Sequence, residues 1–313
     1  MKCLIAGGAG FIGSHVTARF ARAGHAVTVV DGLLPRTAGR RENLAGAAGI
    51  RFVDAPVEQV KNLAELVAEN DLLVDCMGWT CHRLALQDPL YDMQLNIGSH
   101  LALINAIAPG AGKKVISLGT RTQYGNPKVE IITEETPSVP QDTQGAHKQA
   151  AESNWQVFSR IKGFDVISLR FGNCFGPRQP TRGEDLGLIG SFIRDLLQGR
   201  EIELFGAGRR RPVIYAGDVA EAVHLCAQSS FHGFHMFNLA GADVLLEDLL
   251  ELLIREIGHG SYQLREFPPE IKSIDVGNAT FSGKRLETFL GRVPLTSLEA
   301  GIKETVGYFR KAL

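Results

Sequence analysis

The sequence lacks a net charge of either sign, a paired cysteine motif and a long uninterrupted hydrophobic run. Its formal net charge is −1. A chain so close to neutral has no general attraction for polyanions, so we expect no nucleic-acid partner. The run Arg209-Arg210-Arg211 is the only marked cluster of one sign, and such runs usually lie on solvated faces.

The cysteines and the apolar runs exclude further classes of protein. The five cysteines are odd in number and show neither CxxC spacing nor the histidine pattern of a zinc site. They therefore favour a reducing, cytoplasmic location and predict no structural metal. Glycines interrupt the first apolar run, and no small-residue cleavage signal follows it. We therefore expect neither an export signal nor a membrane span.

What is present indicates a large α/β protein. With 313 residues, of which 44% are hydrophobic and 21% charged, the chain can bury a large core in two lobes of unequal size. Short β-branched runs alternate with helical patterns up to about residue 170. The expected strands are 2–6, 26–30, 50–53, 71–76, 113–117 and 164–169, and the expected helices are 11–23, 60–68, 89–108 and 144–161. This order predicts a doubly wound parallel sheet, a Rossmann fold, with ligands at the carboxyl ends of its strands.

The alternation ends after Pro177, which predicts a smaller carboxyl-terminal α+β lobe. We assign residues 1–173 to the nucleotide-binding domain, and 174–211 with 240–313 to a substrate lobe. The strand 212–215 and the helix 217–227 are expected to return to the first sheet, so that about 212–239 belongs to the first domain. No internal repeat or low-complexity linker separates the two parts.

A glycine-rich turn follows the first predicted strand and opens a helix. Gly7, Gly10 and Gly13 have GxxGxxG spacing, with Phe11 and Ile12 between the last two. Glycine allows a tight turn and a close approach of backbone to a pyrophosphate, and the helix amino terminus supplies N–H groups. A glycine triplet alone is a weak signal, but its strand-turn-helix context predicts a dinucleotide site.

An acidic residue closes the second predicted strand. Asp31 is placed where a carboxylate binds the adenosine ribose hydroxyls and repels a 2′-phosphate, which favours NAD over NADP. Arg36 is close in sequence and either softens this preference or is a surface loop residue. Asp54, after the third strand, either contacts the adenine or has a structural role in a turn.

Together with these residues, further motifs identify a family resemblance over nearly the whole chain. The chain resembles the extended short-chain dehydrogenase/reductase family, in its NAD-dependent sugar-nucleotide epimerase/dehydratase branch. The matching motifs are Asp88-Pro89 with Asn96, Tyr124-Gly125-Asn126-Pro127, residues 170–178, Phe205-Gly206-Ala207-Gly208, Arg211 through Asp218-Val219-Ala220, Phe237-Asn238, and Leu290-Gly291 with Pro294 and Gly301. The resemblance implies a nucleotide-sugar ligand and a homodimer built on helices 89–108 and 144–161.

The resemblance also implies catalytic positions, one of which is altered. It places the hydroxyl that binds the reacting sugar oxygen on Thr120, and the lysine of a YxxxK helix on Lys148, beside the nicotinamide ribose. The tyrosine that acts as general base would stand at position 144, where this chain has glutamine. A carboxamide neither takes up nor releases a proton near neutral pH. Thr120 is followed by Arg121-Thr122, where the 4,6-dehydratases carry Asp-Glu, so dehydration is disfavoured.

Several residues are expected on the substrate side. The resemblance implies that Asn173 and Arg211 contact the diphosphate, that Phe205 lies near the base, and that Lys272 is the nearest equivalent of a second cation. The segment after the fourth strand departs from the family pattern. There, Trp79 and His82 either line the sugar pocket or belong to a lid loop in which Trp79 is packed.

Three interpretations of Gln144 stay open. In an active epimerase another group takes the proton: His147 is the best candidate because it lies three residues later on the same side of the helix, and Tyr124 and His82 are weaker ones. Alternatively, the enzyme uses NAD and a nucleotide sugar in a lyase or epimerase step without oxidation at C4. In the third interpretation the chain is a nucleotide-binding sensor or scaffold with a disabled site.

Overall fold

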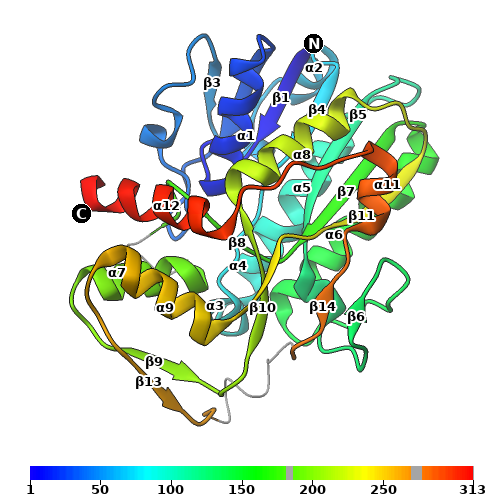
Figure 1. Cartoon of the computed structure of the whole chain (residues 1–313). Coiled ribbons are helices and arrows are strands. Elements are labelled where there is room, and N and C mark those ends of the chain that lie inside the picture. Colours follow the sequence, from blue (N-terminus) through cyan, green and yellow to red (C-terminus); the bar gives the residue numbers. More distant parts are fainter. Residues whose placement is uncertain (181–185, 269–276, 313) are drawn as a thin grey trace.

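A parallel sheet of seven strands forms the centre of the molecule (Figure 1). The computed structural model describes residues 1–180, 186–268 and 277–312. The strand order is β11-β7-β5-β4-β1-β2-β3, and every pair in this sheet is parallel. The strands are β1 (Lys2–Ala6), β2 (Ala26–Asp31), β3 (Arg51–Asp54), β4 (Leu72–Asp75), β5 (Lys114–Thr120), β7 (Asp165–Phe171) and β11 (Phe234–Leu239). The predicted Rossmann fold and its six predicted strands are confirmed.

Helices cover both faces of this sheet because its strands are apolar on both sides. In β1, Cys3 and Ile5 pack in one core cluster with side chains of α1 (Phe11–Arg22) and α8 (Ala216–Gln228). Leu4 and Ala6 point the other way and pack with α2, α5 and α6. The covering helices of that second face are α2 (Leu63–Ala68), α5 (Ser99–Ala106) and α6 (Thr143–Lys162).

Local sequence signals set the ends of the helices around the site. Asp142 is the N-cap of α6, and its Oδ1 accepts the Gly145 N–H at 2.7 Å; Gly163 ends the helix with a φ of 71°. The predicted helix 89–108 is divided into α4 (Pro89–Met93), a π-helical turn η3 (Gln94–Gly98) and α5. The remaining short elements of this part are η1 (Arg41–Leu44), η2 (Val57–Gln59), α3 (His82–Gln87), η4 (Arg121–Tyr124) and β6 (Ile131–Ile132).

The second lobe has its own small sheets and its own core. Its strands are β8 (Asn173–Phe175), β10 (Arg210–Tyr215) and β12 (Ala242–Leu245) in one sheet, β9 (Ile202–Phe205) with β13 (Tyr262–Arg265), and β14 (Thr280–Phe281), which pairs with β6. Its helices are α7 (Leu188–Leu197), α9 (Leu246–Ile257) and α12 (Leu298–Ala312), whereas α11 (Lys284–Leu290) packs against β11 of the large sheet. Buried residues of α7, α9 and α12, among them Phe192, Leu249 and Val306, form its core.

One predicted return to the first sheet is wrong. The segment at 212–215 belongs to β10, which pairs with β8 and β12 in the separate three-stranded sheet. The helix prediction is confirmed, because α8 packs against α1 on the large sheet, and β11 then joins its edge. The chain thus crosses between the lobes more than once, which brings loops of both lobes to the carboxyl ends of the parallel strands.

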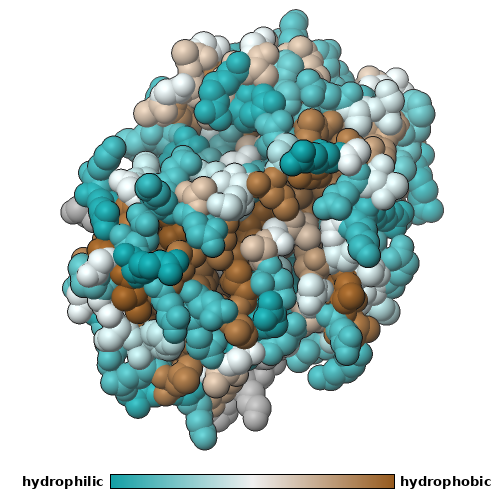
Figure 2. All heavy atoms as spheres, viewed as in Figure 1, coloured by the Kyte–Doolittle hydropathy of each residue, from teal (hydrophilic) through white to brown (hydrophobic). Residues whose placement is uncertain are grey.

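The outer surface is largely hydrophilic on the face shown in Figure 2, with hydrophobic residues gathered toward the middle of that view. Among the described residues, no helix has the length and apolar character needed to cross a membrane.

Candidate functional site

A cavity of about 800 Å³ lies where the parallel strands end and the two lobes meet. Its lining includes the turn after β1, the end of β2, the loop after β4, the end of β5 and the start of α6. The second lobe contributes residues from β8, α7 and β10. The sheet order places β2 and β4 on opposite sides of β1, so the cavity opens at the topological switch point of the sheet.

The glycine turn is shaped for close packing of backbone. Gly7 has a φ of 74°, and the Gly10 N–H donates to the Gly7 carbonyl oxygen at 3.1 Å. A Cβ on Gly13 would lie 2.1 Å from that same oxygen, so only glycine fits there. The N-cap of α1 is Gly10, whose lack of a side chain leaves the first N–H groups of the helix facing the cavity. This cradle fits a dinucleotide pyrophosphate.

Asp31 ends β2 in the same wall of the cavity. Its Oδ2 accepts the Ala9 N–H and its Oδ1 accepts the Leu33 N–H, each at 2.9 Å. Burial raises the pKa of this carboxyl, and the two N–H donors oppose that rise. The carboxylate is thus held rigidly at the edge of the cavity, where a ribose with two free hydroxyls fits it.

Two charged residues that were expected near the adenosine lie elsewhere. Asp54 is exposed and forms a 3.9 Å ion pair with Arg41, and it is not among the described residues that line the cavity. Arg36 donates to Asp88 at 2.9 Å and lies over the rings of Trp79 and Tyr91. The structure therefore favours the turn role for Asp54 and gives Arg36 a packing role in its loop.

Gln144, Thr120 and Thr122 form one hydrogen-bonded group in the cavity wall. Thr120, at the end of β5, and Thr122 have their Oγ1 atoms 3.1 Å apart, and Thr122 Oγ1 donates to Gln144 Oε1 at 3.2 Å. Gln144 is 1% exposed, yet it borders the cavity. None of these three side chains titrates near neutral pH, so this group binds polar atoms without exchanging protons.

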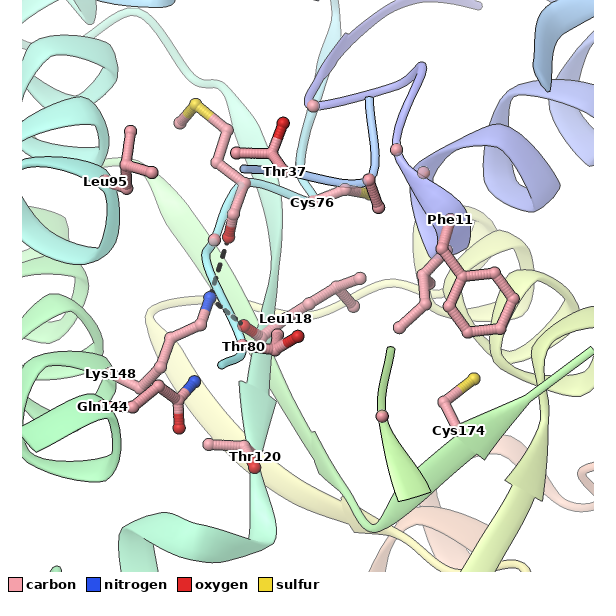
Figure 3. A pocket seen from close by; sticks show the side chains of 18 of the residues that line it. Phe11, Thr37, Cys76, Thr80, Leu95, Leu118, Thr120, Gln144, Lys148 and Cys174 are labelled. Atoms are coloured by element: carbon pink, nitrogen blue, oxygen red, sulfur yellow. Dashed lines mark hydrogen bonds between the residues drawn. The ribbon is translucent and has the colours of Figure 1, made fainter. Parts of the chain in front are cut away.

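Lys148 lies one helical turn after Gln144 on the same face of α6 (Figure 3). Its Nζ donates to the carbonyl oxygens of Met77, at 2.8 Å, and Leu118, at 3.2 Å. Burial lowers the pKa of the ammonium group, and the charge of Asp75 opposes that shift. Phe11 and Cys174 lie on the opposite side of the cavity in the same view, so Lys148 faces the space between the lobes.

The structure argues against two of the proposed proton acceptors. His147 donates from Nδ1 to Asp92 at 2.6 Å and does not occur among the described lining residues, because its direction on α6 differs from that of Gln144 and Lys148. Tyr124 is 1% exposed, donates to Asn238 at 2.8 Å, and has its pKa raised to about 12 by burial. Neither side chain reaches the cavity.

Of the two neighbouring residues Trp79 and His82, the first is buried and the second borders the cavity. Trp79 is 0% exposed, its Nε1 donates to the Arg36 carbonyl oxygen at 2.9 Å, and its ring packs edge-on against Tyr91. Trp79 is therefore a packed side chain of this loop and is not among the described residues that line the cavity. His82 borders the cavity, and its Nδ1 lies 2.7 Å from Asp142 Oδ2.

Of the residues predicted to bind the nucleotide sugar, some line the cavity and others do not. Asn173 and Arg211 both line the cavity, and Arg211 donates to the carbonyl oxygens of Arg210 and Gly277. Phe205 is partly buried with its ring centroid 6.5 Å from that of Phe267, and it is Phe267 that lines the cavity. Lys272 lies outside the described residues.

Sequence reasoning missed three residues of the site. Asp142 and Phe267 line the cavity, and Asp75 is a fully buried carboxylate beside Lys148. An N-cap signal was available for Asp142, because this aspartate lies two residues before the predicted helix 144–161. Asp75 lies next to the last residue of the predicted strand 71–76, where functional carboxylates often occur, whereas no local pattern distinguishes Phe267.

The chain is similar to known proteins over its whole length. The sequence profile of the NAD dependent epimerase/dehydratase family matches residues 3–240. The UDP-glucose 4-epimerase of Mycolicibacterium smegmatis is 28% identical, with 99% of each chain covered. The crystal structure of the Thermotoga maritima UDP-glucose 4-epimerase with UDP-glucose has a TM-score of 0.86 and 29% identity, and covers 100% of this chain and 99% of that one. The Thermus thermophilus UDP-glucose 4-epimerase complex with NAD has a TM-score of 0.85 and 28% identity over 100% of both chains.

Proposed function

Because the chain belongs to the NAD dependent epimerase/dehydratase family, we propose that it is an enzyme that binds NAD and a nucleotide sugar in one cavity and oxidises the sugar reversibly. An epimerisation is the reaction that this proposal favours. The relatives of 28–29% identity that act on UDP-glucose support this choice of substrate class.

The continuity of the cavity carries the proposal. One space of about 800 Å³ is lined by the glycine turn and Asp31 and by Asn173 and Arg211. Thr120 and Lys148 line the same space. A dinucleotide on the first set and a nucleotide sugar on the second would meet beside the threonine hydroxyl.

The residues present fit NAD. The amino terminus of α1 would hold the pyrophosphate, Asp31 the adenosine ribose, and Lys148 the nicotinamide ribose. Asp31 also disfavours NADP, because its carboxylate would repel a 2′-phosphate. When bound, NAD supplies a hydride acceptor that later returns the hydride. On the other side, Arg211 and Asn173 would hold the diphosphate, and Thr120 would orient the sugar hydroxyl.

Gln144 would replace the tyrosine of the YxxxK pattern without changing its surroundings. The side chain keeps the place one turn before Lys148, and its hydrogen bond from Thr122 keeps it in the cavity wall. It would bind a sugar hydroxyl but would not accept its proton. The enzyme therefore needs a proton acceptor elsewhere in the cavity.

The same observation favours a second candidate function. A cavity that keeps its cofactor and substrate ends but has an amide at position 144 is also suited to a sensor that binds NAD and a nucleotide without turnover. The presence of Thr120 and Lys148 argues against this candidate, because a protein that only binds the two ligands would not need the hydroxyl and the ammonium group expected beside the reacting atoms.

Calorimetry and product analysis on the same mixtures test both candidates. The titrated ligands are NAD, NADP and UDP-, GDP- and dTDP-sugars, and each mixture is then analysed for product. The proposal expects tighter binding of NAD than of NADP, and turnover of at least one sugar. Binding of both ligands without any turnover would favour the sensor.

Variants at position 144 sharpen this test. Gln144→Tyr introduces a phenol, whereas Gln144→Phe provides a matched control of similar size without a hydroxyl. Activity that appears only in Gln144→Tyr would identify a disabled enzyme site. An active wild type that loses little in Gln144→Phe would show that the proton leaves by another side chain.

We also infer a homodimer through α4 and α6. Leu90 and Ile161 on these helices are 72% and 69% exposed, and a dimer interface would cover these large apolar side chains. Light scattering should give twice the chain mass, and Ile161→Glu should shift the protein toward the monomer. A monomeric wild type at micromolar concentration would contradict this inference.

A further inference from the structure

A histidine-carboxylate pair borders the cavity at the beginning of α6. His82 Nδ1 lies 2.7 Å from Asp142 Oδ2. The His82 side chain is 37% exposed and that of Asp142 is 4% exposed, so the imidazole is accessible while its partner is buried. Both residues line the cavity together with Thr120 and Gln144.

Asp142 is held as a carboxylate. Burial alone would raise its pKa, but the hydrogen bond and charge of His82 and the N–H of Gly145 outweigh burial, so the pKa lies below its usual range. A buried carboxylate on Nδ1 fixes the orientation of an imidazole and stabilises the imidazolium that forms when the ring takes a proton. With Nδ1 on the carboxylate, Nε2 is the ring nitrogen at which a proton would be exchanged.

The pair lies near the hydroxyl group expected to bind the sugar. A Cβ on Gly145 would lie 2.8 Å from the Thr122 carbonyl oxygen, so the first turn of α6 packs directly on η4. The same turn contains Gln144, which accepts from Thr122, whose hydroxyl in turn contacts Thr120. His82, fixed to Asp142 at the cap of this turn, therefore borders the same end of the cavity as Thr120.

We propose that His82, oriented by Asp142, is the proton acceptor that replaces the side chain at position 144. This inference rests on the proposed function. In the forward step the O–H bond of the sugar carbinol breaks and its proton bonds to His82 Nε2. NAD held by the amino terminus of α1, Asp31 and Lys148 would supply the acceptor for the C–H hydride, so that the carbinol carbon would become a ketone. With the hydride returned to either face of the ketone, His82 would give back the proton.

The structural alternative is that Asp142 only caps α6 and His82 only ties the α3 loop to it. Three variants separate the two roles. His82→Gln keeps a hydrogen-bond donor for Asp142, and His82→Ala leaves room for added imidazole. Asp142→Asn keeps an acceptor for the Gly145 N–H, because asparagine is as good an N-cap as aspartate, but removes the charge.

Stopped-flow absorbance of bound NAD after mixing with the active nucleotide sugar measures the hydride step, and calorimetry gives the dissociation constants of NAD and UDP. We expect His82→Gln to slow the step by about 10²–10⁴-fold, with both dissociation constants within about twofold of wild type. Imidazole should restore part of the rate to His82→Ala. Asp142→Asn should lower kcat with little change in KM or melting temperature.

Two other histidine-carboxylate pairs provide comparisons. His232, 97% exposed and 3.5 Å from Asp165, is remote from the cavity, so His232→Gln should leave the rate unchanged. His147→Gln should likewise keep the hydride step, and a loss there with an active His82→Gln would overturn the inference. A wild type that turns over no sugar would overturn the proposed function and this inference together. A wild type that is active, with a His82→Gln variant equally active, would overturn only this inference.

Discussion

Lys148 and Met77 are joined by a 2.8 Å hydrogen bond from Nζ to the carbonyl oxygen. A second bond, to Leu118, ties the same ammonium group to β5, so one side chain links α6 to the ends of two neighbouring strands. A Cβ on Gly78 would lie 2.9 Å from Lys148 Nζ, which shows how closely the loop after β4 wraps around this group. The lysine therefore holds the wall of the cavity in shape.

Lys148→Met is expected to weaken NAD binding and to destabilise the fold. It leaves the two carbonyl oxygens without their donor, at about 1–3 kcal/mol for each buried group. It also removes a hydrogen-bond donor from the proposed ribose site, so the dissociation constant of NAD should rise by roughly tenfold or more. Urea unfolding and calorimetry measure the two effects.

Lys162→Met is the matched control for this variant. Lys162 also lies on α6 and donates to three backbone carbonyl oxygens, those of Ile104, Asn105 and Ile107. It does not border the cavity among the described residues. Lys162→Met should therefore lower the free energy of unfolding and leave the affinity for NAD unchanged. Equal losses of NAD affinity in the two variants would contradict the proposed cofactor role of Lys148.

Gly13→Ala is expected to abolish NAD binding. The new methyl group would meet the Gly7 carbonyl oxygen at 2.1 Å, so the turn and the start of α1 must separate. Overpacking of this kind costs about 1–3 kcal/mol of stability, and the displaced N–H groups would no longer face a pyrophosphate. Gly307→Ala in α12 is the control, because no atom outside the backbone of its own helix and its two chain neighbours lies within 4 Å of its added Cβ. It should stabilise the protein by about 0.4–1 kcal/mol and bind NAD normally.

The sequence predicts the parts of this protein that depend on short stretches of chain. Parallel strands buried on both faces give continuous apolar runs such as residues 3–6. The glycine turn could be predicted because a tight turn with a positive φ, as at Gly7, favours glycine. Gln144 and Lys148 are one turn apart on a helix, so their shared face could be predicted as well. These features need no knowledge of distant residues.

Other features depend on contacts between distant parts of the chain. The predicted strand 212–215 looks like any short apolar strand, and only the pairing of β10 with β8 and β12 assigns it to the second lobe. The direction of Trp79 is decided by its packing with Tyr91 and Arg36, and no pattern around it distinguishes a buried ring from a pocket ring. The His82-Asp142 contact joins residues that are 60 positions apart. Such contacts are set by tertiary packing, which composition and periodicity do not encode.

Glu152→Gln is expected to be one of the most destabilising conservative substitutions in the protein. The Arg170 guanidinium is 2% exposed and pairs with Glu152, whose charge raises the pKa of Arg170 against the opposing effect of burial. Removal of one partner leaves a buried charge without its counter-ion, which costs about 3–5 kcal/mol.

The exposed pair Arg51 and Glu69 is the control for the buried pair. Both side chains are 57% exposed, and their atoms lie 3.3 Å apart. Glu69→Gln should change the free energy of unfolding by less than about 1 kcal/mol. Chemical denaturation of both variants measures the difference, and equal effects would show that Arg170 finds another partner when Glu152 is lost.

The stability of the protein should decrease in mild acid because of His15. Its Nε2 donates to the Pro177 carbonyl oxygen at 2.8 Å. Burial and the charge of Arg178 lower its pKa to about 3, although the hydrogen bond to Pro177 opposes that shift. Between about pH 3 and the ordinary histidine pKa of about 6.5, the unfolded chain binds a proton at this residue that the native state does not. The free energy of unfolding therefore falls as the pH falls, by roughly 2 kcal/mol at pH 5 from this group alone.

His15→Gln isolates this contribution, because glutamine keeps a donor for the Pro177 carbonyl oxygen and does not titrate. Urea unfolding of wild type and variant at several pH values between 7 and 5 cancels the contributions of all shared groups. The free energy of unfolding of the variant, relative to that of the wild type, should rise steadily as the pH falls, by about 2 kcal/mol over this range. If the difference in free energy of unfolding between wild type and His15→Gln did not change with pH, this prediction would be wrong. That result would mean that His15 takes up a proton in the native state as readily as in the unfolded chain.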